Sequence, residues 1–227
     1  MFDWKLPTHR RGFLGRVAGS AAALSLTQLA RPFELSAAPP QGPAKEDPAV
    51  TAWLGKLKGK HRQIYDTPEL NGGFALAWSR IFYMTNNETG VPDADISVMV
   101  VLRHAAIPLA MVDAAWAKYK FGEFFKITDP KTNAPAVRNI FYKTAAGELP
   151  LPGMDIGDLL QTGVLFGACN MAIRFYSGAM AKSTGGNAED IRKDWLASVI
   201  PGMQVVPSGV WAVNRAQEHG CTYCFAG

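Results

Sequence analysis

The chain has 227 residues, of which 48% are hydrophobic, and this length supports one well-buried core rather than two large domains. The formal net charge of +4 is unevenly distributed, because residues 1–38 carry five basic and two acidic residues. The remainder holds 18 basic and 17 acidic residues and is therefore almost neutral. This balance removes the electrostatic argument for nucleic-acid binding.

The first residues of the chain carry the features of an export signal. Residues 9–14 read His-Arg-Arg-Gly-Phe-Leu, a weakly apolar run rich in Gly and Ala covers 17–29, and small residues follow at 36–38. This order of features resembles a twin-arginine translocation signal. It departs from the usual pattern in the histidine before the arginine pair and in Gly15, where a lysine is common. The resemblance implies that residues 1–38 direct the folded protein to the periplasm or out of the cell.

We expect cleavage near Ala37 or Ala38, while the prolines that follow leave retention as an uncleaved anchor open. A disordered basic arm is the alternative to an export signal. The apolar run is too poor in Leu and Ile for a membrane span, and no later segment reaches the roughly 18 uninterrupted apolar residues that a span requires. No stable membrane span is therefore expected after signal removal.

After a linker with a short helix over 39–59, residues 60–227 are predicted to form one domain. Periodicity and turn residues predict, in order, a weak strand at 61–66, a helix at 71–86, a strand at 96–102, helices at 109–119 and 156–161, a strand at 164–168, helices from 171 to about 184 and from 187 to about 199, a strand at 204–206, a helix at 208–218 and a strand at 221–226. This alternation predicts a three-layer α/β/α sandwich on a mostly parallel sheet of about five strands.

Helical periodicity also predicts the apolar faces of two helices. They are Phe74, Trp78 and Ile81/Phe82 in the first helix, and Met171, Phe175 and Ala179 in the helix after Cys169.

Residues 121–152 form a long insert that contains Phe124, Phe125, Phe141 and Tyr142. Loops of this length in a compact domain are usually functional or disordered, and the aromatic content argues against disorder. We interpret the insert as a lid over a pocket or as part of a subunit interface.

Reactive and polar side chains stand where the predicted strands end, which is where open α/β sheets bind ligands. They are Asp66, Arg103, His104, Cys169, Asn170 and Ser208. The candidate catalytic residue among them is Cys169, and the candidate binding residues are Arg103, His104, Asn170 and Ser208.

The position of Cys169 between a strand and a helix favours a thiolate, because the first turn of a helix presents free N–H groups and a positive dipole end. Arg103 and a cationic His104 would lower the pKa of a neighbouring thiol further. The structural alternatives are a Cys169 that packs as a small buried hydrophobe, a hydrogen-bonded structural His104, and helix caps at Asp66 and Ser208.

An oxidising destination makes the three cysteines informative, since an odd count leaves at least one thiol free or joined to another chain. Cys221 and Cys224 lie three positions apart in a predicted strand, where such side chains point to opposite faces. We favour two cysteines that line the core, while a disulfide between Cys169 and one of them stays open.

Metal and cofactor motifs receive no support. A single Cys-x-x-Cys pair without a second pair or a histidine cluster is a poor zinc signal, and His219 stands before the pair instead of after it, as c-type haem attachment requires. The sequence also contains no Walker loop, Gly-x-Ser-x-Gly elbow, His-Glu-x-x-His pair or Gly-x-Gly-x-x-Gly loop. We therefore predict neither a metal nor a cofactor.

The segment 164–170, with its cysteine between strand and helix, resembles the DsrE/DsrF-like family of small sulfur-relay proteins. The blocks at 200–210 and 214–220 resemble an exported branch of that family, and the resemblance covers roughly 60–227. It implies a DsrE-like fold, homo-oligomers and, through Cys169 alone, persulfide transfer. The export signal and the long insert at 121–152 depart from the family pattern.

Two functions are therefore carried forward. The first is an exported protein that carries sulfur as a persulfide or exchanges thiols through Cys169, with a sulfur donor or acceptor protein as partner. The second is a non-enzymatic small-ligand-binding or assembly module in which Cys169 is structural. The sequence leaves the donor, the acceptor and the oligomer size open.

Overall fold

The computed structural model describes residues 47–227. The export signal predicted over 1–38 and the linker up to residue 46 lie outside these described residues. Within residues 47–227, no helix combines the length and the apolar character needed to cross a membrane.

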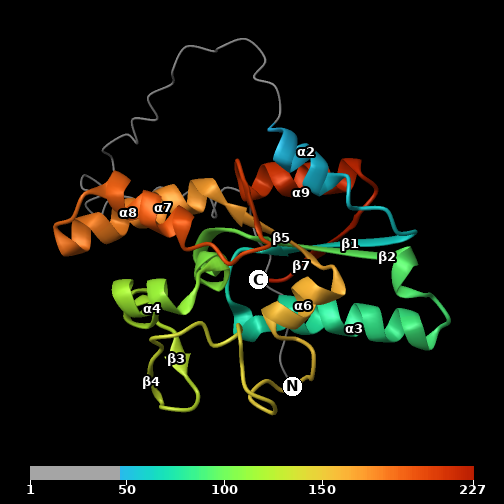
Figure 1. Cartoon of the computed structure of the whole chain (residues 1–227), viewed down its shortest axis with the longest axis horizontal. Helices are drawn as coiled ribbons and strands as arrows, with labels where there is room; N and C mark the ends of the chain where they lie inside the picture. Colours follow the sequence, from blue (N-terminus) through green and yellow to red (C-terminus); the bar gives the residue numbers. More distant parts are fainter. Residues whose placement is uncertain (1–46) are drawn as a thin grey trace, which may run out of the picture. The chain divides into compact units, whose positions relative to one another are not determined.

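The described chain alternates strands and helices (Figure 1). Its strands are β1 His61–Thr67, β2 Ile96–Leu102, β3 Thr128–Asp129, β4 Ala134–Pro135, β5 Leu165–Cys169, β6 Gln204–Val206 and β7 Thr222–Phe225. Its α-helices are α2 Pro48–Leu54, α3 Phe74–Glu88, α4 Asp113–Tyr119, α5 Phe121–Phe125, α6 Ile156–Thr162, α7 Asn170–Thr184, α8 Ala188–Ala197 and α9 Gly209–Glu218. The 3₁₀ turns are η2 Asn71–Gly73, η3 Asp93–Asp95 and η4 His104–Ala110.

Five of the strands form one parallel sheet in the order β6-β5-β2-β1-β7. The central strand β2 is buried along its whole length, and its side chains alternate between two separate cores. Val98, Val100 and Leu102 face one core, whereas Met99 and Val101 face the other. Each fully buried side chain of this kind contributes about 1.5–3 kcal/mol, which explains the near-continuous apolar sequence of β2.

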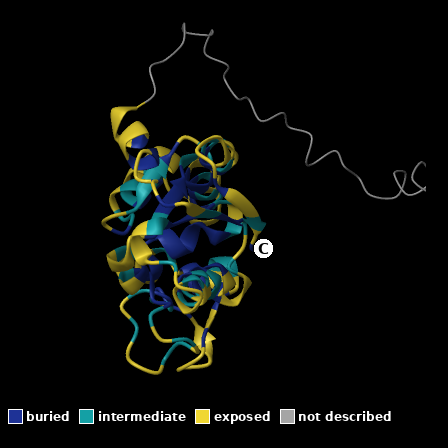
Figure 2. Cartoon of the chain, turned by 90° about the vertical axis from the view of Figure 1, so that its right-hand side faces the viewer, coloured by how far each residue is buried: buried dark blue, intermediate teal, exposed yellow. Residues whose placement is uncertain are grey.

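The two cores define the layers of the fold. Helices α2 and α9 cover one face of the sheet, and α3 and α6 cover the other (Figure 1). The sheet and the inward sides of these helices form the buried interior, while the outer helix surfaces are exposed (Figure 2). Helices α7 and α8 pack against each other and lie toward the carboxyl ends of the strands. The predicted three-layer α/β/α sandwich on a parallel five-stranded sheet is confirmed.

Side-chain caps set the starts of several helices. Asp47 and Asp155 accept hydrogen bonds from N–H groups in the first turns of α2 and α6. Asn187 and Ser208 do the same for α8 and α9. These side chains satisfy N–H groups that have no partner within the helix, which is why the predicted starts of α6, α8 and α9 agree closely with the structure.

The predicted apolar faces of the first helix and of the helix after Cys169 are correct only in part. Trp78 and Phe82 pack against the larger core, whereas Phe74, Ile81, Met171 and Phe175 are exposed. Helix α3 buries Ala75, Leu76, Ser79 and Tyr83 and leaves Phe74 50% exposed. Helix α7 buries residues such as Ala172 and Ile173, while Met171 and Phe175 are exposed. The buried faces of both helices combine small side chains with larger ones such as Leu76, Tyr83, Ile173 and Met180.

The helix predicted at 109–119 is also wrong at its beginning. The backbone is extended at Met111 and Val112, which separates η4 from α4. The Val112 N–H donates to the Ser198 carbonyl, and the Ile200 N–H donates to the Ala110 carbonyl. The Ala110 carbonyl and the Val112 N–H are thus paired with the chain at the end of α8 instead of with helical partners.

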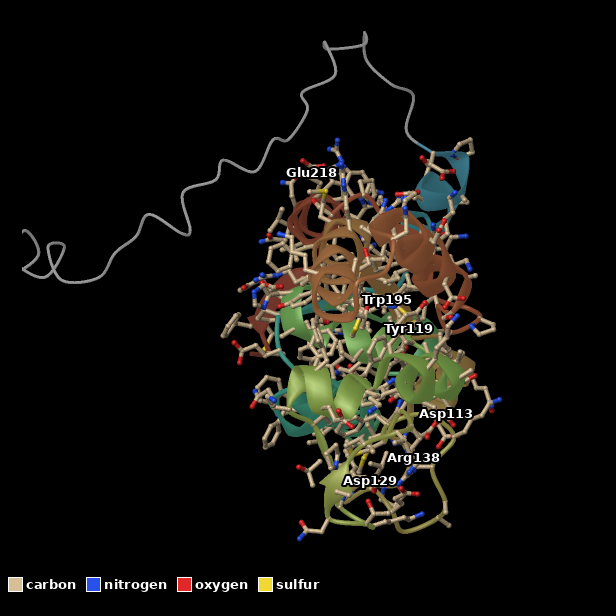
Figure 3. The ribbon with its side chains drawn as sticks, turned by 90° about the vertical axis from the view of Figure 1, so that its left-hand side faces the viewer. Asp113, Tyr119, Asp129, Arg138, Trp195 and Glu218 are labelled. Atoms are coloured by element: carbon tan, nitrogen blue, oxygen red, sulfur yellow. The ribbon has the colours of Figure 1, made fainter. Side chains whose placement is uncertain are left out.

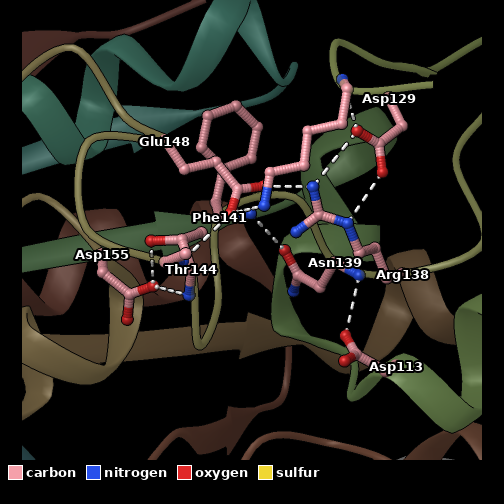
Figure 4. Close-up of polar contacts among 10 residues, drawn as sticks. Asp113, Asp129, Arg138, Asn139, Phe141, Thr144, Glu148 and Asp155 are labelled. Atoms are coloured by element: carbon pink, nitrogen blue, oxygen red, sulfur yellow. Dashed lines mark hydrogen bonds and ion pairs between the residues drawn. The ribbon is translucent and has the colours of Figure 1, made fainter. Parts of the chain in front are cut away.

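The insert at 121–152 is ordered by polar contacts (Figure 4). Arg138 pairs with Asp129, with Nε 2.7 Å from Oδ2, and also with Glu148. The Lys131 ammonium, the Ala145 N–H and Arg138 lower the pKa of Glu148 to about 2. The insert is therefore a folded part of the domain.

Aromatic packing joins the start of the insert to α8. The Tyr119 and Trp195 rings lie 5.7 Å apart (Figure 3), and Phe121 lies 4.8 Å from Trp195. The Tyr119 hydroxyl donates to Asp194 at 2.6 Å. Trp116 and Trp195 are fully buried, whereas Trp211 of α9 is partly buried.

Asn139 is the buried polar anchor of the insert. Its amide nitrogen donates to the Leu109 and Met111 carbonyls at 3.0 Å each, and its side-chain oxygen accepts from the Phe141 N–H at 3.1 Å. Asn139→Ala leaves these buried groups without partners and is expected to lower the free energy of unfolding by about 3 kcal/mol. Urea denaturation measures the change. The exposed Asn214 on α9 is the control, and an Asn139→Ala effect no larger than that of Asn214→Ala would contradict the anchor role.

Candidate functional site

The parallel register brings the predicted site residues to one edge of the sheet. Leu102 of β2 pairs with Ala168 of β5, and Cys169 pairs with Val206 of β6. Arg103, the next residue after β2, therefore lies across from Cys169, and Ser208 follows β6 at the same edge.

Arg103 is fixed by a bidentate ion pair with Asp66. Its Nε lies 2.6 Å from Oδ1 and its Nη2 lies 2.9 Å from Oδ2 of the Asp66 carboxylate. The Tyr223 hydroxyl of β7 donates to the same Oδ2 at 2.9 Å. Asp66 is buried, and its hydrogen bond raises the pKa of the Arg103 guanidinium. Asp66 thus pairs with Arg103. The alternative that Asp66 caps a helix is therefore wrong.

Helix α9 holds the other side of the Arg103 side chain. A Cβ atom on Gly209 would lie 2.5 Å from the Arg103 Cβ, so only glycine permits this approach. The preceding residue, Ser208, caps α9 by accepting from the Trp211 N–H at 3.2 Å. Ser208 is therefore a helix cap, which was the structural alternative considered for it, and it places Gly209 against Arg103.

Cys169 is the N-cap residue of α7, and its Sγ accepts from the Ala172 N–H at 3.3 Å. Cys169 also contributes to the raised pKa of Arg103, after the larger effect of Asp66. The residue is only 5% exposed and packs in the larger core, so the sulfur is not open at the rim of the sheet.

His104 and Asn170 have partners outside the Arg103–Cys169 pair. His104 has a φ of +47° and lies against Tyr176 of α7, whose hydroxyl is 3.4 Å from its Nδ1. Asn170 accepts from Arg192 of α8 at 3.3 Å. The structure thus places Arg103 beside Cys169, while His104 joins α7 to the start of η4.

Sequence reasoning did not assign a role to Tyr223, which reaches Asp66 from the last strand. No local signal identifies it, because β7 lies beside β1 only after the chain has crossed the sheet.

The three cysteines are all unpaired. Cys221 is buried in the core beneath α9, and Cys224 is half-buried against the other core, as predicted for two core-lining residues. Burial raises the pKa of Cys221 to about 11 and also raises the pKa of Cys224. In the part of the chain from residue 47 onward, no cluster of three or more His, Cys, Asp or Glu residues is arranged to hold a metal ion.

No family model matches the chain, and no curated protein matches it either. Among solved structures, the chain is similar to the protein of unknown function MTH1491 from Methanobacterium thermoautotrophicum, with 14% identity and a TM-score of 0.39. The alignment covers 73% of this chain and 99% of that chain. A TM-score this low carries no argument about fold or function, and the DsrE/DsrF-like resemblance stays a prediction.

The Asp66–Arg103 pair should contribute measurably to stability. Asp66→Asn leaves a largely buried guanidinium without its counter-charge and should lower the free energy of unfolding by about 2 kcal/mol, whereas Tyr223→Phe removes one hydrogen bond and should cost about 1 kcal/mol. Chemical denaturation measures both. Asp95→Asn is the matched control, because Asp95 pairs with the exposed Lys60 at 3.5 Å. Equal losses in the free energy of unfolding for Asp66→Asn and Asp95→Asn would show that the buried pair stabilises the fold no more than an exposed pair does.

The raised pKa of Cys221 predicts a pH dependence for its alkylation. With a pKa of about 11, only about one Cys221 thiol in a thousand is ionised near pH 8, so alkylation of the folded protein should be slow there and should accelerate up to about pH 11. Peptide mapping after timed iodoacetamide pulses measures the rate. A rate that levels off near pH 9 would indicate an ordinary thiol and contradict the burial effect.

Proposed function

We propose that this protein is an exported thiol protein in which Cys169 accepts and passes on a sulfane sulfur. The observation that carries the proposal is the position of Sγ. It accepts the Ala172 N–H at the start of α7, across from an Arg103 whose geometry Asp66 fixes. A thiolate is the nucleophile in such chemistry. The resemblance to DsrE/DsrF-like proteins and the twin-arginine-like leader support the same proposal.

The chemical step requires no net oxidant. The Cys169 thiolate attacks the outer sulfur of a donor persulfide, R–S–SH. A new S–S bond forms at Cys169, the donor S–S bond breaks, and the donor leaves as the thiolate R–S⁻. The near-complete burial of Cys169 restricts this reaction to a small donor or to a state in which the first turn of α7 opens.

A second function, a non-enzymatic small-ligand-binding module, is favoured by the same burial. On this proposal Cys169 is a packing residue that caps α7, and a ligand binds elsewhere at the carboxyl edge of the sheet. The two functions differ in whether Cys169 reacts in the folded protein.

Mass spectrometry distinguishes them. After incubation of the full chain with a low-molecular-weight persulfide, the first function predicts a gain of one sulfur atom on Cys169, and the Cys221→Ser/Cys224→Ser double variant should retain it. Cys169→Ser should abolish the gain while circular dichroism shows an intact fold. An unmodified Cys169 in folded protein, with modification only after denaturation, would reject the sulfur-carrier function.

A further inference from the structure

A cavity of about 410 Å³ lies beyond the carboxyl ends of β1 and β2. Its walls come from the turn after β1, the start of η4 and the insert, and they include Glu69, Asn71, Ala105, Phe125, Lys126 and Phe141. The volume falls within the range of about 300–1,000 Å³ that is typical of small-molecule sites. The insert thus forms one wall of a pocket.

The insert side of the cavity is held in place before any ligand binds. The Ile127 N–H donates to the Gly122 carbonyl at 2.8 Å, and the Ile127 carbonyl accepts from Ala136 at 2.9 Å. Asn139 fixes the backbone of Phe141 (Figure 4), whose ring lies directly over Gly73. Preformed walls of this kind reduce the entropy that a ligand loses on binding.

Unfavourable backbone conformations gather around this cavity. Asn71 and Lys126, which line it, have φ angles of +41° and +59°. His104, directly before the lining residue Ala105, has a φ of +47°. Left-handed conformations cost a non-glycine residue about 1–2 kcal/mol each, and they are found at functional sites and, as at Lys126 after α5, at the ends of helices.

Two charged residues, both exposed to solvent, lie at the cavity. Glu69 and Lys126 present a carboxylate and an ammonium group, and neither forms an ion pair with any residue between 47 and 227. Phe125 and Phe141 add apolar surface, and Phe125 packs 5.0 Å from Tyr176 of α7. A molecule that carries both charges beside an apolar group complements this lining.

We propose that the cavity binds a small zwitterion with an apolar side chain, of the class of the large hydrophobic amino acids. Its ammonium group pairs with Glu69, its carboxylate pairs with Lys126, and its side chain lies against Phe125 and Phe141. This proposal does not depend on the reactivity of Cys169, and it names the ligand class for the second function above.

Calorimetric titration of the full chain tests it with three related compounds. L-Phenylalanine carries both charges, phenethylamine carries only the ammonium group and 3-phenylpropionate carries only the carboxylate. Saturable binding of one L-phenylalanine per chain is expected, and each analogue should bind about fivefold to tenfold more weakly because it lacks one ion pair. Absence of L-phenylalanine binding at millimolar concentration, or equal binding of all three compounds, would overturn the proposal.

Two substitutions assign the charges. Lys126→Gln should lower the affinity for L-phenylalanine about fivefold and leave the affinity for phenethylamine unchanged. Glu69→Gln should lower the affinity for L-phenylalanine by a similar factor and leave the affinity for 3-phenylpropionate unchanged. Lys143→Gln is the matched control, since Lys143 lies in the same insert with a φ of +55° and does not line the cavity. The Cys169→Ser variant should bind L-phenylalanine with unchanged affinity. A negative result in this titration therefore leaves the persulfide test unaffected, and the reverse also holds. Equal weakening by Lys143→Gln, or binding unaffected by both substitutions, would show that the cavity charges do not hold the ligand.

Discussion

The bidentate ion pair between Asp66 and Arg103 organises the carboxyl edge of this sheet. It joins the ends of the two innermost strands, accepts Tyr223 from the edge strand β7, and requires a glycine at position 209 of α9. A buried carboxylate and a guanidinium that is only 26% exposed are costly to leave unpaired. The alignment of β1, β2, β7 and α9 is therefore coupled through one charged contact.

A second constraint acts within the insert, where polar groups order the chain. Arg138 connects two parts of the insert through Asp129 and Glu148, and Asn139 connects it to the chain around Leu109. A long connection without such anchors would remain mobile, because it buries too few apolar groups to offset its conformational entropy. The anchored insert instead provides a fixed wall for the cavity at Phe125 and Phe141.

The local geometry of Cys169 combines features that point to different functions. The Ala172 N–H and the neighbouring Arg103 suit a reactive sulfur, whereas near-complete burial suits packing. Accessibility is a separate requirement for a nucleophilic thiol, and Cys169 is only 5% exposed in the folded domain. The cavity beside Ala105 lies on the insert side of the same sheet edge, so ligand binding there does not require the sulfur to be exposed.

The sequence by itself determined the parallel α/β architecture, because each strand carries its own signal of apolar residues between turns and several helices begin at a capping side chain. It also identified the ends of the strands as the place where Arg103, Cys169 and Ser208 lie. Tertiary structure alone decided which faces of α3 and α7 are buried, since Phe74 and Phe175 satisfy helical periodicity as well as the small residues that pack inward. It also decided that Asp66 and Tyr223 hold Arg103 and that the insert forms part of the wall of an open cavity. These features depend on contacts between residues far apart in the chain, and local pattern carries no information about which distant partner a side chain will meet.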